Sequence, residues 1–184
     1  PVLNYESGAE PDPALAEIQV ALPPAVANDS WSQPGGSADK SMGNLALGAN
    51  PAPAWSVSIG QGSSGKVHLG AGPVIANGHV YTMDTAATVK AFDAANGHLL
   101  WSHSLDAKGD NRDALFGGGV SVDGDRLYAT TGVGTVTALS AADGHQLWQV
   151  TPGGPLRDAP TIANGQVYGG GGNLVGENTF SAKV

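Results

Sequence analysis

Tryptophan recurs at a nearly constant interval in this chain of 184 residues, at positions 55, 101 and 148. Residues 70–101 align with residues 117–148 at an offset of 47, apart from a one-residue slip near Asn77 and Asp123. A third copy begins at residue 158. Periods of about 40–50 residues are typical of propellers and related repeat proteins, in which each unit buries its apolar faces against its neighbours.

Each copy carries the turn signals of four short strands. In the first copy, Asn77-Gly78 separates two apolar runs, and this dipeptide favours a two-residue hairpin. Gly97 ends a later turn, just before the run that carries Trp101. The expected strands are residues 73–76, 79–83, 88–92 and 99–104. Four antiparallel strands per repeat make one blade, so the sequence predicts an all-β propeller of stacked, four-stranded antiparallel blades.

Seven positions define the repeat, and packing explains each of them. Alanine is expected where strands approach closely, glycine where a turn needs a left-handed backbone, and tryptophan where a large ring fills the wedge between blades. The seven residues are Trp55, Ala91, Gly97, Trp101, Ala138, Gly144 and Trp148.

The chain divides into two parts. Residues 1–30 hold five of the twelve prolines and predict an extended lead-in with a single strand at Ile18–Leu22. Residues 31–184 predict a partial propeller. Its expected parts are a blade-closing strand near residues 55–60, repeats at 70–104 and 117–150, and an incomplete repeat at 158–184.

The third copy is irregular. Eleven residues separate Tyr168 from Thr179, whereas seven separate the corresponding tyrosine and threonine in the other two copies, so four extra residues are expected there. Two open blade faces would remain, and we expect 184 residues alone to be marginally stable or prone to aggregate.

Composition narrows the classes of function. The 28 glycines and 12 prolines disfavour long helices. A formal charge of −8 with no cluster of lysine and arginine argues against a nucleic-acid partner. The absence of cysteine excludes a disulfide, a thiolate metal site and a cysteine nucleophile. No apolar run approaches the roughly 20 residues that cross a bilayer.

Residues 60–65 have the G-x-G-x-x-G spacing of a dinucleotide-binding loop, with Asp84 about twenty residues further on. The segment that follows has no helical periodicity, so no helix N-terminus is expected to receive a pyrophosphate. A loop that joins two blades is the expected interpretation.

Histidines and aspartates are expected at turns. His98 and His145 follow equivalent turn glycines, and no set of residues has the spacing of metal ligands. Aspartate is common in turns because its carboxylate bonds the local backbone. We therefore predict no catalytic residue, no cofactor and no metal.

Connections between blades are the expected contact surfaces, because such loops carry recognition in repeat proteins. The two longest polar connections are residues 108–113 and 152–158. Arg112, Phe116 and Arg157 are the candidate partner-binding residues.

Two segments, 91–101 and 138–148, resemble the tryptophan-docking motif of PQQ-like propeller repeats. Within that superfamily, the stretch from Asn28 to Gly65, which includes Trp31-Ser-Gln-Pro-Gly-Gly, is similar to the opening of the outer-membrane protein assembly factor BamB family in its alphaproteobacterial form. The preceding PALAEIQVALPP is similar to that form as well, and the resemblance covers nearly all of residues 1–168.

The resemblance implies a ring of eight blades, of which about two and a half are present here. It implies a periplasmic, non-enzymatic scaffold of the β-barrel assembly machinery, a lipoprotein at the inner leaflet of the outer membrane. Such a subunit binds the periplasmic domains of the barrel-forming subunit and assists insertion of outer-membrane proteins. Membrane contact is expected only through a lipidated cysteine upstream of the residues given.

Two alternatives stay open. Quinoprotein dehydrogenases resemble this chain in their tryptophan turns and hold PQQ and Ca²⁺ in the propeller channel. That class commonly stacks the quinone on a vicinal disulfide, and this chain has no cysteine. The other alternative is a propeller sensor or binding ectodomain, which would need a membrane-spanning segment outside the residues given.

Overall fold

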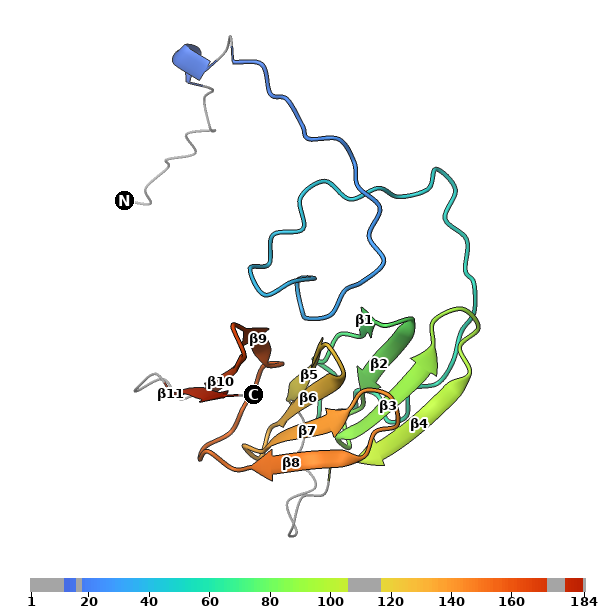
Figure 1. Cartoon of the computed structure of the whole chain (residues 1–184), viewed down its shortest axis with the longest axis vertical. Coiled ribbons are helices and arrows are strands. Elements are labelled where there is room, and N and C mark those ends of the chain that lie inside the picture. The colour runs from blue at the N-terminus through green and yellow to red at the C-terminus, as the bar shows by residue number, and fades with distance from the viewer. Residues whose placement is uncertain (1–11, 16–17, 106–116, 172–177, 184) are drawn as a thin grey trace, which may run out of the picture.

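The computed structural model describes residues 12–15, 18–105, 117–171 and 178–183, and these residues form three antiparallel sheets and one short 3₁₀ helix, η1 (Pro13–Leu15) (Figure 1). The first sheet contains β1 (Val74–Ala76), β2 (His79–Met83), β3 (Thr88–Asp93) and β4 (Leu99–Ser104). The second contains β5 (Gly118–Asp123), β6 (Arg126–Thr131), β7 (Val136–Ser140) and β8 (Gln146–Val150). The third contains β9 (Thr161–Ala163), β10 (Gln166–Gly171) and β11 (Asn178–Lys183).

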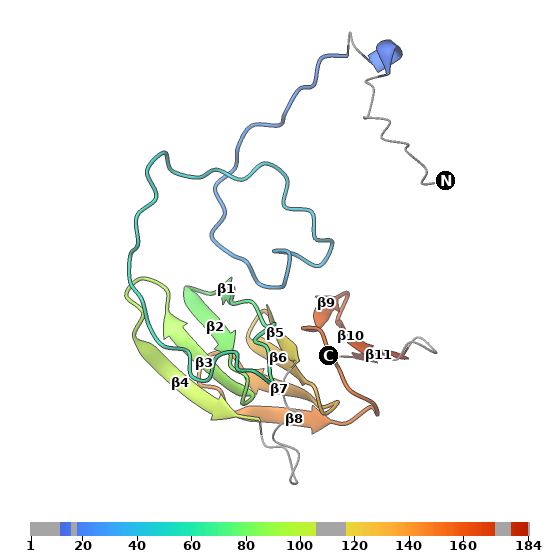
Figure 2. The same ribbon diagram turned by 180° about the vertical axis from the view of Figure 1, so that it is seen from behind.

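Strands pair in chain order within each sheet, which is the topology of a propeller blade. The first strands β1, β5 and β9 converge on one side of the molecule, and β4 and β8 lie on the opposite side; Figure 2 shows the same arrangement from behind. The predicted all-β partial propeller is confirmed, with blade 1 (β1–β4), blade 2 (β5–β8) and three strands of blade 3 (β9–β11) in the described residues.

The first hairpin of each blade uses a two-residue turn. Asn77 and Gly78 both have positive φ, 55° and 72°, as a type I′ turn requires. In blade 2, Asp123 pairs with Arg126, so the turn residues are Gly124 and Asp125, of which only the glycine has positive φ. The expected slip near Asn77 and Asp123 is therefore wrong. The offset of 47 holds through the hairpin, and only the turn type changes.

Blade 3 has a different register from the one that the sequence predicts. Tyr81 pairs with Ala91 and Tyr128 pairs with Ala138, each ten residues further along the chain. Tyr168 pairs with Ser181, thirteen residues further along. The insertion is thus three residues long rather than four. Matching Thr179 to the threonines of the other blades misplaced it by one, and a shift of one residue moves every side chain of a strand to the other face.

The buried core lies between blades rather than inside them. One apolar cluster joins blade 1 to blade 2, and a smaller one joins blade 2 to blade 3. The first contains Tyr81, Val89, Ala91, Trp101, Val120, Leu127 and Leu139, among others. The second contains Tyr128, Val136, Ala138, Leu156, Ile162 and Val167, with Trp148 packed against it. Each blade therefore depends on its neighbour to exclude water.

Two expected strands do not form. Ile18, Val20 and Leu22 are 60%, 86% and 77% exposed, and no strand is assigned to residues 18–22. No strand is assigned to residues 55–60 either. Alternating apolar residues favour a strand, but a strand also needs a neighbouring edge to pair its backbone groups. Neither segment pairs with an edge of a described sheet.

Candidate functional site

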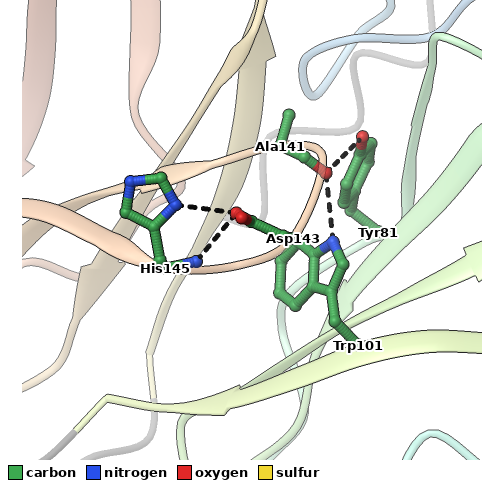
Figure 3. Close-up of polar contacts among 5 residues, drawn as sticks. All are labelled: Tyr81, Trp101, Ala141, Asp143 and His145. Atoms are coloured by element: carbon green, nitrogen blue, oxygen red, sulfur yellow. Dashed lines mark hydrogen bonds and ion pairs between the residues drawn. The ribbon is translucent and has the colours of Figure 1, made fainter.

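The contact between blades 1 and 2 centres on one backbone oxygen. The indole Nε1 of Trp101 donates a hydrogen bond to the carbonyl oxygen of Ala141 at 3.0 Å, and the hydroxyl of Tyr81 donates to the same oxygen at 3.2 Å (Figure 3). Trp101 is 8% exposed and lies in β4, whereas Ala141 lies in the turn between β7 and β8. The outer strand of one blade thereby fastens to a turn of the next blade.

Trp55 makes the same contact one repeat earlier. Its Nε1 donates to the carbonyl oxygen of Ala94 at 2.9 Å, in the turn between β3 and β4. A Cβ placed on Gly97 would lie 2.7 Å from the Trp55 ring. Trp55 therefore holds the position of a fourth-strand tryptophan, although its own segment pairs with no described strand.

The same pair of rings recurs in blade 2 without the shared acceptor. Tyr81 and Trp101 have ring centroids 6.0 Å apart at 47°, and Tyr128 and Trp148 have centroids 6.0 Å apart at 49°. The Tyr128 hydroxyl is buried and has no hydrogen-bond partner among the described residues. Blade 2 thus presents a preformed ring pair whose acceptor is not supplied by the described residues.

A cleft of about 440 Å³ runs between the turns of blades 1 and 2, and its walls include His79, Tyr81, Arg126 and His145. The Tyr81 hydroxyl already donates to Ala141, so Nδ1–H of His79 is the donor in its 3.1 Å contact with the Tyr81 oxygen. The His79 ring and the Tyr81 hydroxyl in this cleft are therefore engaged within the protein.

His145 is held by its neighbour Asp143. Nδ1 of His145 lies 2.8 Å from the Asp143 carboxylate (Figure 3). A hydrogen bond from the Ser140 side chain, followed by those from His145, lowers the pKa of Asp143 to about 2. In the described part of the chain, no three histidine or acidic side chains are grouped so that they could hold a metal ion.

Of the three candidate contact residues, only Arg157 lies within the described residues; Arg112 and Phe116 lie outside them. Arg157 is exposed, on the connection between blades 2 and 3. Its carbonyl oxygen accepts a 2.8 Å hydrogen bond from the Gly118 amide, and the next carbonyl, of Asp158, accepts one of 2.7 Å from the Thr130 hydroxyl. The Ser121 hydroxyl donates to Pro160 at 2.5 Å. Blade 2 therefore fixes the backbone that carries Arg157.

Arg157 borders a second cleft, of about 350 Å³. Lys40 and Asp158 also line this cleft, and small residues such as Gly72 and Ala159 form much of its wall. Two of the eight basic residues of an acidic chain thus meet at one place on the surface.

The G-x-G-x-x-G segment is a loop that packs against a turn of blade 1. The buried Asp84 carboxylate accepts hydrogen bonds from the amides of Gln61, Ala86 and Thr88 at 2.8–3.0 Å. Gly60 has φ of 127°, and a Cβ on it would overlap that carboxylate. No helix follows, so the glycines serve this close approach.

One further segment lies against the inner strands of the blades, and the sequence does not predict its role. We call it the inner-edge cap and define it as Trp31–Gly36. Its first three residues hydrogen-bond in turn to β1, β5 and β9. The Gln33 side chain, 6% exposed, reaches Ile162, which is 129 residues away in the chain. Pro34-Gly35 is the local signal for the turn in this segment, but no local pattern indicates its distant partners.

No helix in the described residues is both long and apolar enough to cross a membrane.

A family model described as outer membrane protein assembly factor BamB matches residues 41–111 and 85–179. BamB of Escherichia coli (strain K12) is 40% identical to this chain over 73 residues, which are 38% of this chain and 18% of that protein. The match to BamB of Shigella dysenteriae serotype 1 (strain Sd197) has the same identity and coverage. The matched stretch spans less than a fifth of these curated relatives.

Solved structures share the fold at lower identity. A europium-containing methanol dehydrogenase has a TM-score of 0.67 and 20% identity, over 84% of this chain and 30% of that chain. Quinohemoprotein alcohol dehydrogenase from Comamonas testosteroni has a TM-score of 0.63 and 22% identity, over 81% of this chain and 24% of that chain. The matched family model covers both complete blades and most of blade 3, and the chain therefore belongs to the PQQ-like propeller repeat family described as outer membrane protein assembly factor BamB.

Proposed function

We propose that the protein is a non-enzymatic scaffold of the outer-membrane β-barrel assembly machinery. In this role it works in the periplasm, binds the periplasmic domains of the barrel-forming subunit, and assists insertion of outer-membrane proteins. Membrane attachment comes through a lipid anchor upstream of the residues given. The similarity to BamB of Escherichia coli and the family membership support this assignment.

The observation that carries the proposal is the fixed backbone of the Arg157 connection. Hydrogen bonds from blade 2 hold the carbonyls of residues 157, 158 and 160, while the Arg157 side chain is exposed. Binding to a fixed loop costs less ordering entropy than binding to a mobile one. Arginine is also enriched among the residues that dominate protein interfaces. We place the partner contact at this connection, together with Arg112 and Phe116 of the preceding one.

The alternative is a dehydrogenase that holds PQQ and Ca²⁺ in the propeller channel, and the structural similarity to two dehydrogenases motivates it. Two observations favour the scaffold. Inner-edge groups of β1, β5 and β9 are already bonded to residues 31–33 of the same chain. In addition, no cluster of carboxylates or histidines suited to a metal occurs among the described residues.

Charge reversal tests the contact surface. R157E and R112E should each weaken binding to the purified periplasmic domains of the barrel-forming subunit at least about tenfold, equivalent to about 1.4 kcal/mol. K66E is the matched control, because Lys66 is an exposed loop residue far along the chain from both connections, and it should change the Kd less than about twofold. Unchanged affinity in both arginine variants would remove the proposed surface.

A second assay separates scaffold from enzyme. The chain incubated with PQQ and Ca²⁺ should oxidise no alcohol in a dye-linked assay. Turnover that depends on both additions would support the dehydrogenase and contradict the scaffold.

A further inference from the structure

The inner-edge cap crosses three blades at equivalent points. Ile75, Val122 and Ile162 each stand one residue before the end of the first strand of their blade, where the hairpin turn begins. Their backbone groups on the inner edge face away from the second strand and have no partner within the blade. The three blades therefore present a repeated set of free main-chain donors and acceptors.

The cap forms hydrogen bonds with one residue of this set in each blade. Trp31 exchanges two hydrogen bonds with Ile75, of 2.7 Å to the Ile75 oxygen and 2.9 Å from the Ile75 amide. The Val122 amide donates to the carbonyl oxygen of Ser32 at 2.8 Å. The first two contacts use only main-chain groups of the cap, so they do not depend on its side chains.

At the third blade, the side chain of Gln33 makes the contact that main-chain groups of the cap make at the first two blades. Its Nε2 donates to the Ile162 oxygen and its Oε1 accepts from the Ile162 amide, both at 2.9 Å. A primary amide carries a donor and an acceptor side by side, as a peptide group does. Glutamate has the same length and lacks the donor, so this position distinguishes glutamine from glutamate.

A tight turn prepares the cap for this contact. The Gly36 amide donates to the Gln33 oxygen at 2.8 Å, and Gly35 has φ of 83°, the pattern of a type II turn with proline at its second position. The side chains of Lys40 and Met42 lie against Gly35 and Gly36 and would have to move if either glycine carried a side chain, and the positive φ of both glycines disfavours any other residue. The fixed turn lowers the entropy lost when Gln33 is buried.

From this geometry we propose that the inner edges of β1, β5 and β9 form a binding site for one extended polypeptide segment, and that the chain fills this site with its own residues 31–33. The site recognises main-chain groups at two blades and a primary amide side chain at the third. It adjoins the proposed partner contact, because Pro34 of the cap lines the same cleft as Arg157. It differs from that contact in its ligand, an extended chain that crosses exposed strand edges of three blades.

Because residues 31–33 of the same chain occupy this site, any other peptide must compete with them. A tethered segment acts at an effective concentration of the order of millimolar, so a free peptide must displace the cap before it binds. Weakening the cap without removing it should therefore open the site to a peptide added in solution.

The test uses the full chain and a fluorescent peptide with the sequence of residues 28–36. The peptide should bind the Q33E chain at least about tenfold more tightly than the wild-type chain. The same peptide carrying glutamate in place of glutamine should bind neither. An S32A chain is the matched control, because Ser32 contributes only its carbonyl oxygen, and it should behave as wild type. Equal binding of the two peptides to the Q33E chain would overturn the proposal, as would no binding at all.

A second measurement needs only the wild-type chain. Amide hydrogen exchange at Ile75, Val122 and Ile162 should be slow, because all three amides are bonded to the cap. If Q33E folds, exchange at Ile162 should rise at least about tenfold relative to S32A. Unprotected exchange at Ile162 in the wild-type chain would contradict the proposal even if Q33E does not fold.

Discussion

The ring of Trp101 lies against Gly144 of the following blade, so closely that a methyl group on Gly144 would overlap the indole. Gly144 also has φ of 73°, a left-handed conformation that side chains disfavour. Trp55 and Gly97 repeat this contact one blade earlier. Both the tryptophan and the glycine of the repeat thus belong to one interlocking contact.

We expect G144A to lower the free energy of unfolding by about 2–4 kcal/mol, because a left-handed alanine costs about 1 kcal/mol and overpacking adds about 1–3 kcal/mol. G78A is the matched control. Gly78 has nearly the same φ, 72°, but no atom lies within 4 Å of a Cβ placed there, so only the first cost of about 1 kcal/mol applies. Urea denaturation followed by tryptophan fluorescence gives both values. Equal losses would show that Trp101 exerts no steric constraint on Gly144.

Tyr81 and Tyr128 are both fully buried, but only Tyr81 has a hydrogen-bond acceptor among the described residues. Y81F should cost about 1 kcal/mol, since it removes the bond to Ala141. Y128F should change stability by less than about 0.5 kcal/mol or increase it, because an unpaired buried hydroxyl is itself unfavourable. The same denaturation assay compares them, and a larger loss in Y128F would contradict this account.

The Asp84 carboxylate joins the loop at residues 60–62 to blade 1 through backbone amides. D84N keeps the shape but places an NH₂ group against one of these amides, so a loss of about 1–3 kcal/mol is expected. D125N is the control, because the Asp125 side chain is 96% exposed, and a change below about 0.5 kcal/mol is expected there. A neutral D84N would mean that the loop is not held by this carboxylate.

Asp143 gives a prediction about pH. Its pKa in the folded chain, about 2, lies below the ordinary value of 3.8, so folding favours the ionised carboxylate. The stabilising effect is complete above about pH 4 and is lost as the pH falls from 3.8 toward 2. NMR titration of the Asp143 carboxyl carbon should give a midpoint near 2, and D143N should lose this part of the pH dependence. A midpoint near 3.8 would show that Ser140 and His145 do not hold the carboxylate.

Local patterns were sufficient to predict the blades. The Asn77-Gly78 turn and the apolar runs on either side of it place β1 and β2 within one residue of their observed bounds. Turn residues and apolar runs of this kind lie within a few residues of the strand that they predict. They also predicted the fourth strand, because the turn at Gly97 and the tryptophan after it are adjacent in the chain.

Contacts between distant residues could not be predicted in the same way. Gln33 bonds to Ile162, which lies 129 residues further along the chain. The residues around a glutamine are the same whether it lies at an exposed turn or binds a distant strand, so the local sequence does not indicate this contact. The segment at 18–22 shows the opposite error, since its alternation is typical of a strand but no described edge pairs with it. Among the candidate contact residues, Arg157 is exposed as expected, and its role remains a prediction.

The spacing between each tryptophan and the alanine that it bonds in the next blade bears on how propellers gain or lose blades. Trp55 reaches Ala94 across 39 residues and Trp101 reaches Ala141 across 40, each less than the repeat length. Duplication of one repeat would therefore add one donor tryptophan and one acceptor turn together, already matched to their neighbours. A lineage could gain or lose a blade in a single genetic event without having to evolve a new interface.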